Sequence, residues 1–384
     1  MKKFTFVDLF CGIGGFHQAM SSLGGKCVFA SEIDTHCIEV YKENYHINCN
    51  FDITKVDAKD IPDHDVLCAG FPCQSFSKAG KQLGTKDTRG TLFFEIERIL
   101  RVKHTKYIIL ENVRNLVSHD KGATWSIIQS VLKDIGYRLT LKPLILSPYE
   151  FRVPQTRDRV YILGIYDPKN RNIPLEISFN GLFSKSDNSI YSILEDNVDD
   201  KYKISKEEEK ILNIWNEFYV GIKEDVIGFP VWVDYFKKYP SNSYPDWKKE
   251  IIKNNNDLYL NNKYFIDNWL RKYNYLKSFN PSRRKFEWQA GKEIDNLWEG
   301  VIQLRPSGIR VKKPDVFPAL VAIVQIPIIG RFKRRLTPRE CARLQSFPDK
   351  FKICQEDHYA YKEFGNSVNV KILKKLAKNL FEYK

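Results

Sequence analysis

Short apolar runs alternate with amphipathic stretches over residues 1–170. Six runs have the length and composition of buried strands: Phe4–Leu9, Cys27–Ser31, Asp65–Ala69, Tyr107–Glu111, Leu139–Leu146 and Val160–Ile165. Between several of these runs, the pattern predicts helices over Gly15–Leu23, Leu92–Arg101 and Trp125–Ile135. Strands that alternate with helices at this spacing predict an α/β domain with a largely parallel sheet.

The pattern changes after about residue 172. Residues 173–300 are rich in Lys, Asn, Tyr and Trp, show weak periodicity, and hold six of the seven tryptophans. We predict that this region is a separate module, whose aromatic residues mostly form its own core. Regular patterning returns after Arg331, and the stretch Val370–Phe381 is typical of a basic amphipathic helix.

Composition narrows the class of protein. The chain has 384 residues and 43% hydrophobic residues, which is enough for two globular domains. The formal net charge of +14 favours a polyanionic partner such as nucleic acid, although a Lys-rich composition from an AT-rich genome gives the same charge. No apolar run reaches transmembrane length and the N-terminus is no signal peptide, so we expect a cytoplasmic protein.

The eight cysteines contain no CxxC pair, which argues against a zinc cluster and against a disulfide framework. We expect most of them to be small buried residues, and we expect no metal. Cys73 is different, because it stands between a proline and a glutamine in the run Gly70–Ser77, just past a predicted strand. A junction between strand and loop can expose a cysteine and favour its thiolate, as a nucleophile requires.

A second group of residues indicates a nucleoside site. The glycine-containing segment Asp8–Phe16 follows the first predicted strand, where glycines let the backbone turn tightly and approach a ligand. Its spacing is not the dinucleotide pattern GxGxxG. Glu32 ends the second predicted strand and is placed to accept both hydroxyls of a ribose, and Asp52 is placed to accept an adenine amino group. These positions predict a nucleoside cofactor without identifying it.

Two further segments carry charged residues at strand ends. Glu111 ends the apolar run before it, where burial raises a carboxyl pKa and suits a proton donor; a structural acid is the alternative. Arg157 and Arg159 precede another strand and, as alternate residues, share a face; solvated charges on an edge strand are the alternative.

Taken together, these segments resemble the DNA (cytosine-5) methyltransferase family of bacteria. The match covers about 170 residues at the N-terminus and 55 at the C-terminus, in six ordered motifs: Asp8–Phe16, Gly70–Ser77, Glu111–Val113, Gln155–Arg159, Arg335–Glu340 and Gly365–Val368. The resemblance implies an S-adenosylmethionine-dependent methyltransferase fold, which is Rossmann-like with a mostly parallel sheet and helices on both faces, plus a smaller target-recognition domain.

The resemblance also implies a role for each motif residue. Cys73 corresponds to the nucleophile that adds to C6 of cytosine, and Glu111 to the residue that contacts N3 and the exocyclic amine. Arg159, supported by Arg157, corresponds to the group that holds the base through O2. The implied S-adenosylmethionine pocket consists of Phe10, Gly12, Gly14, Glu32, Ile33, Asp52, Pro72, Asn366 and Val368.

DNA contacts are expected in two places. The segment 74–91 is rich in glycine and basic residues and is similar to a loop that closes over DNA, which assigns Ser77, Lys81 and Arg89 to the interface. Basic clusters near the end of the variable region add Arg310 and Arg334 as phosphate contacts. Ala319 occupies the position where the family often has a threonine near the flipped base.

The resemblance implies a discontinuous catalytic domain. We expect residues 1–172 to form the catalytic and cofactor-binding domain, completed by residues 356–384. Residues 173–355 are expected to form the target-recognition domain, with its variable part at about 173–330 and a bracing helix at about 338–345. Thr337-Pro338-Arg339-Glu340 has the pattern of a capping box that begins this helix.

The resulting hypothesis is a monomeric DNA cytosine-5 methyltransferase that uses S-adenosylmethionine and acts on a short sequence in double-stranded DNA. We expect it to be the modification enzyme of a restriction–modification system, whose nuclease acts on the same site without a stable complex, and to associate with the nucleoid. A tRNA cytosine-5 methyltransferase is one alternative, which the long region 173–330 disfavours. A non-catalytic DNA-binding regulator on the same fold is another, which the intact Cys73 and Glu111 disfavour.

Overall fold

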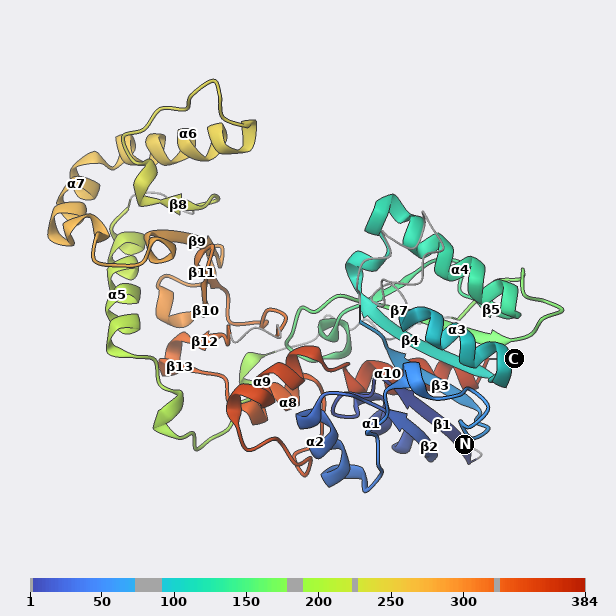
Figure 1. Cartoon of the computed structure of the whole chain (residues 1–384). Helices are drawn as coiled ribbons and strands as arrows, with labels where there is room; N and C mark the ends of the chain where they lie inside the picture. The colour runs from blue at the N-terminus through green and yellow to red at the C-terminus, as the bar shows by residue number, and fades with distance from the viewer. Residues whose placement is uncertain (1–2, 73–91, 178–188, 223–226, 321–324, 384) are drawn as a thin grey trace. The chain divides into compact units, whose positions relative to one another are not determined.

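The computed structural model describes residues 3–72, 92–177, 189–222, 227–320 and 325–383. These residues form two compact units, which are drawn in Figure 1 and described separately. The first unit is discontinuous and comprises Met1–Asn188, Ala319–Ile323 and Cys341–Lys384. The second unit comprises Ser189–Pro318 and Val324–Glu340.

A mixed sheet forms the centre of the first unit. Its strands are β1 (Phe4–Leu9), β2 (Gly25–Ser31), β3 (Val66–Gly70), β4 (Tyr107–Val113), β5 (Tyr137–Leu139), β6 (Leu144–Leu146) and β7 (Arg159–Tyr166). The strand order is β2-β1-β3-β4-β7-β5, and β6 also pairs with β7. Strands β1 to β4 pair in parallel, whereas β7 runs antiparallel to β4, β5 and β6. The predicted α/β class is confirmed, and the predicted run Leu139–Leu146 is two strands instead of one.

Helices cover both faces of this sheet, as predicted. They are α1 (Gly15–Ser21), α2 (Thr35–Tyr45), α3 (Leu92–Lys103), α4 (Ala123–Ile135), α9 (Asp357–Asn366) and α10 (Val370–Phe381). Apolar residues of α3 and α4 pack against the side chains on one face of the sheet, such as Leu67, Ile108 and Ile162, and form one hydrophobic core with them. On the opposite face, α10 packs beside α1.

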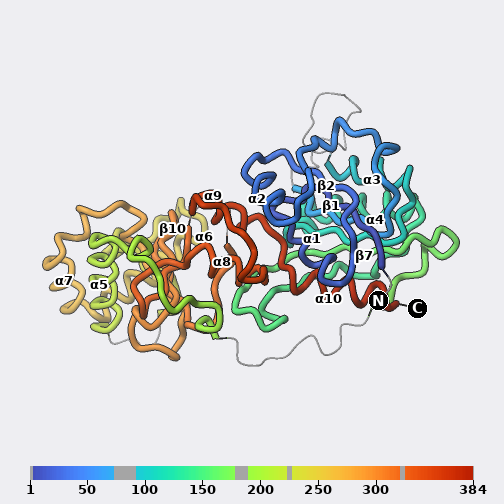
Figure 2. The backbone as a smooth tube through the Cα atoms, turned by 90° about the horizontal axis from the view of Figure 1, so that it is seen from below, coloured from blue at the N-terminus to red at the C-terminus, as the bar shows by residue number. Residues whose placement is uncertain are grey.

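The two ends of the chain meet on this second face. The rings of Phe4 in β1 and Phe381 in α10 lie 5.0 Å apart, and Phe381 lies equally close to Tyr107 of β4. Figure 2 shows the start of the chain before β1 and the end of α10 near each other. The basic amphipathic C-terminal helix is therefore part of the first unit, since its apolar side closes the core that the N-terminal strand begins.

The unit boundaries differ from the predicted domain boundaries at three places, since the first unit also takes in residues 173–188, 319–323 and 341–355. Residues 173–177 belong to the first unit because the N–H of Leu175 donates to the carbonyl of Leu139. Residues 341–355 also belong to it, since the Gln345 side chain donates to the Gln155 side chain at 3.1 Å. These contacts join distant segments and leave no periodic signal in the sequence.

The second unit has a sheet of its own, in the order β13-β12-β10-β11-β9-β8. Its strands are β8 (Val231–Trp232), β9 (Lys285–Gln289), β10 (Val301–Arg305), β11 (Gly308–Lys312), β12 (Ile328–Ile329) and β13 (Arg334–Arg335), and its helices are α5 (Lys206–Gly221), α6 (Asp246–Asn261) and α7 (Lys263–Lys272). Trp215, Trp269 and Trp288 are buried in its core, as predicted for this module, whereas Trp247 is exposed.

The predicted capping box is present at α8 (Pro338–Leu344). The N–H of Glu340 donates to Thr337 Oγ1 at 3.1 Å, and the N–H of Thr337 donates to Glu340 Oε2 at 2.8 Å. Glu340 Oε1 also accepts from the N–H of Glu195 at 2.9 Å, which ties the start of α8 to the start of the second unit. The helix thus begins at Pro338, where the sequence predicted.

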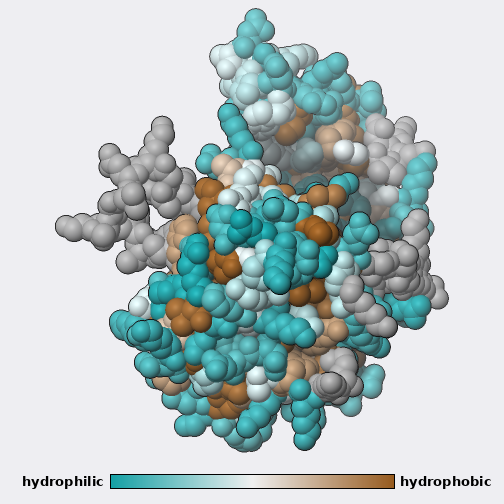
Figure 3. All heavy atoms as spheres, turned by 90° about the vertical axis from the view of Figure 1, so that its right-hand side faces the viewer, coloured by the Kyte–Doolittle hydropathy of each residue, from teal (hydrophilic) through white to brown (hydrophobic). Residues whose placement is uncertain are grey.

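Polar side chains cover most of the face in Figure 3, and apolar residues are scattered between them. Within the described ranges, no helix combines the length and the apolar character that crossing a membrane requires.

Candidate active site

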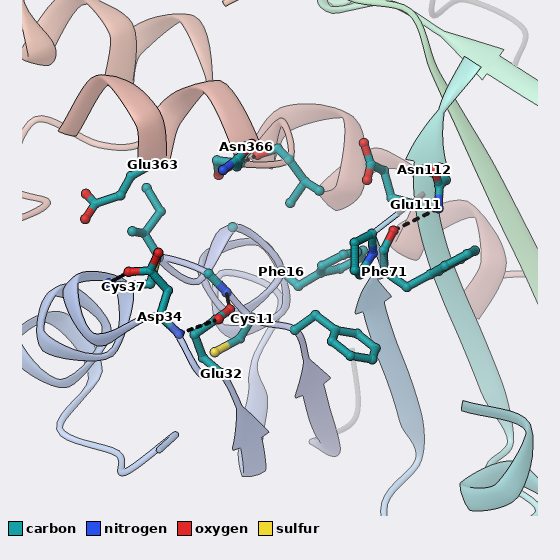
Figure 4. A pocket seen from close by; sticks show the side chains of 18 of the residues that line it. Cys11, Phe16, Glu32, Asp34, Cys37, Phe71, Glu111, Asn112, Glu363 and Asn366 are labelled. Carbon is teal, nitrogen blue, oxygen red and sulfur yellow. Dashed lines mark hydrogen bonds between the residues drawn. The ribbon is translucent and has the colours of Figure 1, made fainter. Parts of the chain in front are cut away.

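A cavity of about 730 Å³ opens at the carboxyl ends of the parallel strands of the first unit. The segments that follow β1, β2, β3 and β4 line it, together with the end of α9 and the residues after it. Because parallel strands end at the same edge of a sheet, segments far apart in the sequence meet here. A volume of this size is typical of a small-molecule site. Figure 4 shows ten labelled side chains of the cavity.

The glycine-containing segment after β1 turns tightly beneath the cavity. Phe10, Gly12 and Gly14 all have positive φ angles, of 54°, 52° and 85°. A Cβ atom on Gly14 would lie 2.3 Å from the ring of Tyr45, so only glycine fits there. Gly14 itself does not line the cavity. Its role is to shape the turn that places Phe10 and Gly12 at the cavity.

Glu32 is held rigidly at the end of β2. Its Oε2 atom accepts from the N–H of Gly12 at 2.8 Å, and its Oε1 atom accepts from the N–H groups of Ile33 at 2.8 Å and Asp34 at 3.0 Å. A carboxylate has about four acceptor positions. The three backbone donors therefore leave about one position for a ligand, fewer than the two that a ribose diol would use.

Asp52 lies at another side of the cavity and begins a short 3₁₀ helix. Its Oδ1 atom accepts from the hydroxyl of Thr54 at 2.7 Å and from the Thr54 N–H at 3.1 Å. These hydrogen bonds, helped by Lys55 at 3.2 Å, lower the pKa of the Asp52 carboxyl below its usual range. Asp52 is thus a permanent acceptor, as an adenine amino group requires.

The residues after α9 return to the cavity beside the glycine-containing turn. Asn366 and Val368 both line the cavity, and a Cβ on Gly15 would lie 2.6 Å from the side chain of Val368. Of the nine predicted cofactor residues, eight line the cavity: Phe10, Gly12, Glu32, Ile33, Asp52, Pro72, Asn366 and Val368.

The residues present fit a nucleoside that carries a positive charge. Glu32 keeps an acceptor position, and the buried hydroxyl of Ser31 lines the cavity without a partner among the described residues. The side chains of Phe16 and Phe71 add aromatic faces. Acidic and aromatic groups are the complement that a purine nucleoside with a sulfonium group would use.

Glu111 lies at the opposite side of the cavity from Glu32 in Figure 4. It lies within the buried part of β4, and its carboxylate Oε1 lies 3.1 Å from Nε of Arg159. Burial raises the pKa of the Glu111 carboxyl, and the positive charges of Arg159 and Arg157 oppose that rise in part. A buried carboxyl that is protonated more readily than usual is suited to donate a proton.

Arg157 lines the cavity and is also a structural clamp. Its guanidinium donates to three carbonyl groups, those of Leu320 at 2.7 Å, Gly365 at 2.8 Å and Ser367 at 3.0 Å. Burial, followed by repulsion from Arg159, lowers the pKa of Arg157 to about 9, so it stays charged at neutral pH. Its donors hold the segment after α9 against the site.

Replacing Arg157 with alanine is expected to lower the free energy of unfolding by about 3 kcal/mol or more, because three buried carbonyl groups lose their donor at about 1–3 kcal/mol each. Urea unfolding measures this. Arg114→Ala is the matched control, since Arg114 is exposed and its ion-pair partner among the described residues is Asp158; it is expected to cost about 1 kcal/mol or less. Equal losses in the two variants would contradict the clamp.

Cys73 lies outside the described residues, as do Ser77, Lys81 and Arg89. The described chain reaches Pro72, which lines the cavity and directly precedes Cys73. The side-chain amide of Asn112 donates to the carbonyl of Phe71 at 2.8 Å and so fixes the backbone just before Pro72 (Figure 4).

Arg334 is not available as the phosphate contact that the sequence predicted. Its two terminal nitrogens donate to the two carboxylate oxygens of Glu340 at 2.9 and 2.7 Å, and the residue is buried. This buried ion pair holds the first turn of α8, where Glu340 lies. Arg310 is half-buried, with its guanidinium 3.0 Å from Glu287 Oε2; its contact with DNA stays a prediction.

Sequence reasoning missed several residues of the cavity. Phe16 and Phe71 belong to the motifs Asp8–Phe16 and Gly70–Ser77. Assigning every residue of a motif to the site would have found both of them. Asn112 directly follows Glu111. Glu363 stands three residues before Asn366, a spacing that places two helical residues on one face.

A mixed sheet whose strands β1 to β4 are parallel, with a glycine-containing turn, an acidic strand end and a separate module, is typical of a nucleoside-dependent enzyme of the Rossmann-like class. The family model of the C-5 cytosine-specific DNA methylases matches residues 4–382. Among relatives, the chain is 32% identical to the Type II methyltransferase M.AluI of Cellulosimicrobium cellulans, over 97% of this chain and 91% of the relative. It is 30% identical to M.HhaI of Haemophilus parahaemolyticus, over 98% and 93%.

Solved structures show the same fold. A putative DNA modification methyltransferase encoded within an Escherichia coli prophage has a TM-score of 0.60 at 20% identity, with 99% of both chains covered. A mutant of DNMT2 from Spodoptera frugiperda has a TM-score of 0.56 at 21% identity, with 98% of this chain and 99% of that chain covered.

The chain therefore belongs to the C-5 cytosine-specific DNA methylase family. It is a DNA (cytosine-5-)-methyltransferase, a member of a family that takes its methyl group from S-adenosylmethionine.

Proposed function

We propose that this enzyme methylates C5 of a flipped-out cytosine within a specific short sequence of double-stranded DNA, through a covalent bond between Cys73 and C6. The observation that carries the proposal is the Glu111–Arg159 pair, 3.1 Å apart, in a cavity that Pro72 also lines. A proton donor, a fixed cation and the residue next to a cysteine thus share one site.

The chain's own residues divide the work as follows. The Cys73 thiolate forms a bond to C6, the π pair of C5=C6 moves into the C4–C5 bond, and the π pair of C4=N3 moves onto N3. Glu111 donates a proton or hydrogen bond to N3, which neutralises the accumulating charge. Arg159 holds the pyrimidine O2 and keeps Glu111 in place. S-adenosylmethionine, when bound, would supply an electrophilic methyl group to C5 and would leave as S-adenosylhomocysteine. Loss of the C5 proton and of the thiolate, with return of the N3 proton to Glu111, then restores the aromatic base.

Cytosine inside a duplex presents neither face to Cys73, so the nucleotide must leave the stack. That step costs about a few kcal/mol, which contacts to DNA have to offset. The net charge of +14 supports such contacts. We propose that the second unit, with the segment 74–91, supplies them and selects the sequence.

The relatives named Type II methyltransferases support a role as the modification enzyme of a restriction–modification system. We propose that the enzyme works as a monomer, because every described residue assigned to the site belongs to one compact unit of one chain. Its cognate endonuclease would then act on the same DNA site without a stable complex.

Bisulfite sequencing tests this function. Genomic DNA from a methylation-free bacterial host that expresses the chain is expected to contain 5-methylcytosine in one short motif. Purified enzyme is then offered duplex DNA or tRNA with labelled methyl donor. Incorporation into tRNA alone would replace DNA with RNA as the substrate, and no incorporation into either by folded protein would contradict the proposed chemistry.

A further inference from the structure

Glu363 is a buried acid in the cavity to which none of the roles above applies. It lies on α9, one turn before Asn366, and lines the same cavity (Figure 4). Only 4% of the residue is exposed, and neither carboxylate oxygen has a hydrogen-bond partner within the part of the chain that the structure describes. Since burying an unpaired polar group is costly, such a group in a ligand cavity indicates a missing partner.

Its protein neighbours do not supply that partner. The nearby cation, Lys362, places its Nζ atom 2.9 Å from Asp34 Oδ2 and is used by that acid. Burial and the negative charge of Asp34 raise the pKa of Glu363 to about 7, and Lys362 opposes the rise more weakly. Cys37 and Cys354 also face this carboxylate, and burial raises the pKa of both thiols, so they add no positive charge.

A single bound water cannot fill the acceptor positions of both carboxylate oxygens of Glu363, since a carboxylate has about four such positions. The recess between α2 and α9, lined by Asp34, His36, Tyr359 and Glu363, has a volume of about 10 Å³. That is room for about one water molecule. The larger cavity on the other side of Glu363 is where a ligand has space to reach it.

Glu32 explains why a second acid is useful here. Three backbone N–H groups occupy its carboxylate and leave about one acceptor position. A ribose offers two neighbouring hydroxyl donors. We propose that Glu363 is a second ribose-binding carboxylate, which accepts a hydrogen bond from the ribose hydroxyl of the methyl donor that Glu32 does not hold. This inference rests on the proposed use of S-adenosylmethionine.

The experiment is calorimetric binding of S-adenosylhomocysteine and of its 2′-deoxy and 3′-deoxy analogues to the full chain. Glu363→Ala is expected to bind S-adenosylhomocysteine about tenfold more weakly than wild type, as expected for one lost hydrogen bond of about 1.4 kcal/mol. Glu363→Gln keeps an acceptor oxygen and is expected to lose less than threefold. Glu356→Gln, on the exposed residue before α9, is the matched control and is expected to bind normally.

The analogues decide where Glu363 acts. One deoxy analogue is expected to bind wild type and Glu363→Ala equally, because the group that Glu363 contacts is already missing. If the alanine variant weakens all three ligands by the same factor, the proposal is overturned. If it leaves the affinity for 5′-methylthioadenosine unchanged, Glu363 contacts the amino-acid part and the proposal is also overturned.

Should the alanine variant fail to fold, Glu363→Met replaces it. Failure of the wild type to bind S-adenosylhomocysteine would instead contradict the proposed function.

Discussion

Replacement of Cys73 by alanine is expected to abolish methyl transfer, with a loss of about 10⁴-fold or more in kcat, while binding of DNA and S-adenosylmethionine persists. The expectation follows from the role of the thiolate: cytosine C5 is a poor nucleophile until a bond at C6 turns the ring into an enamine. No other cysteine among the described residues lines the cavity near Glu111, since Cys11 and Cys37 lie on its Glu32 side (Figure 4).

Cys68→Ala provides the control for this experiment. Cys68 stands five residues earlier in β3, is fully buried, and has a thiol pKa that burial raises well above its usual value, so it is inert. Cys68→Ala is expected to remain active, with a modest loss of stability. The measurement is transfer of labelled methyl groups to duplex DNA, together with trapping of the enzyme on 5-fluorocytosine DNA. Wild-type turnover or trapping in the Cys73 variant would remove Cys73 from the mechanism.

Replacement of Glu111 by glutamine is expected to lower kcat by about 10²–10⁴-fold, the usual contribution of a positioned proton donor. The amide keeps the size of the side chain and a hydrogen-bond donor, but it has no proton to give to N3. It also leaves Arg159 without its carboxylate, 3.1 Å away in the wild type. Affinity for S-adenosylhomocysteine is expected to stay within about threefold, since Glu111 lies across the cavity from Glu32.

The pH dependence gives a second readout for Glu111. Because burial raises its pKa above the ordinary value, the protonated form persists to higher pH than usual and is lost as the pH rises through that raised pKa. Activity that needs this proton therefore falls on the alkaline side, whereas activity that needs the Cys73 thiolate falls on the acid side. We expect a bell-shaped profile of kcat in the wild type and no alkaline fall in Glu111→Gln.

Asp158→Asn serves as the matched control for Glu111. Asp158 precedes Arg159 but pairs with the exposed Arg114 and does not line the cavity. Its variant is expected to keep the wild-type rate and the wild-type profile. An unchanged alkaline limb in Glu111→Gln would assign that limb to another group and leave Glu111 with a structural role only.

Strands and helices of the first unit were predictable because their signals are local. The run Phe4–Leu9 matches β1 at both ends, and the predicted start of the last helix at Val370 is observed. Thr337 and Glu340 form the predicted capping box because its partners stand three residues apart. The run Leu139–Leu146 was harder, since both of its halves pair with one strand, β7, and only that pairing separates them.

Arg334 shows where local reasoning failed. Its place in a run of basic residues indicated a surface that binds phosphate, but Glu340, six residues on, takes both ends of its guanidinium. The sequence shows that a residue is basic, but it does not show whether its side chain already forms an ion pair within the folded protein. The same limit applies to Arg157, whose three carbonyl partners come from segments more than 160 residues away.

The sequence alone determined the family, the fold class, eight of the residues that line the cavity, and the acid Glu111 across the cavity from Glu32, because each rests on a short motif or a periodic run. Only the tertiary structure decided which hydrogen-bond donors and acceptors of these motifs are paired with each other. It showed that backbone N–H groups nearly saturate Glu32, that Arg157 is a clamp, and that Glu363 lines the cavity with no hydrogen-bond partner among the described residues. Hydrogen-bond partners and burial depend on segments that meet only after folding, which no local pattern encodes.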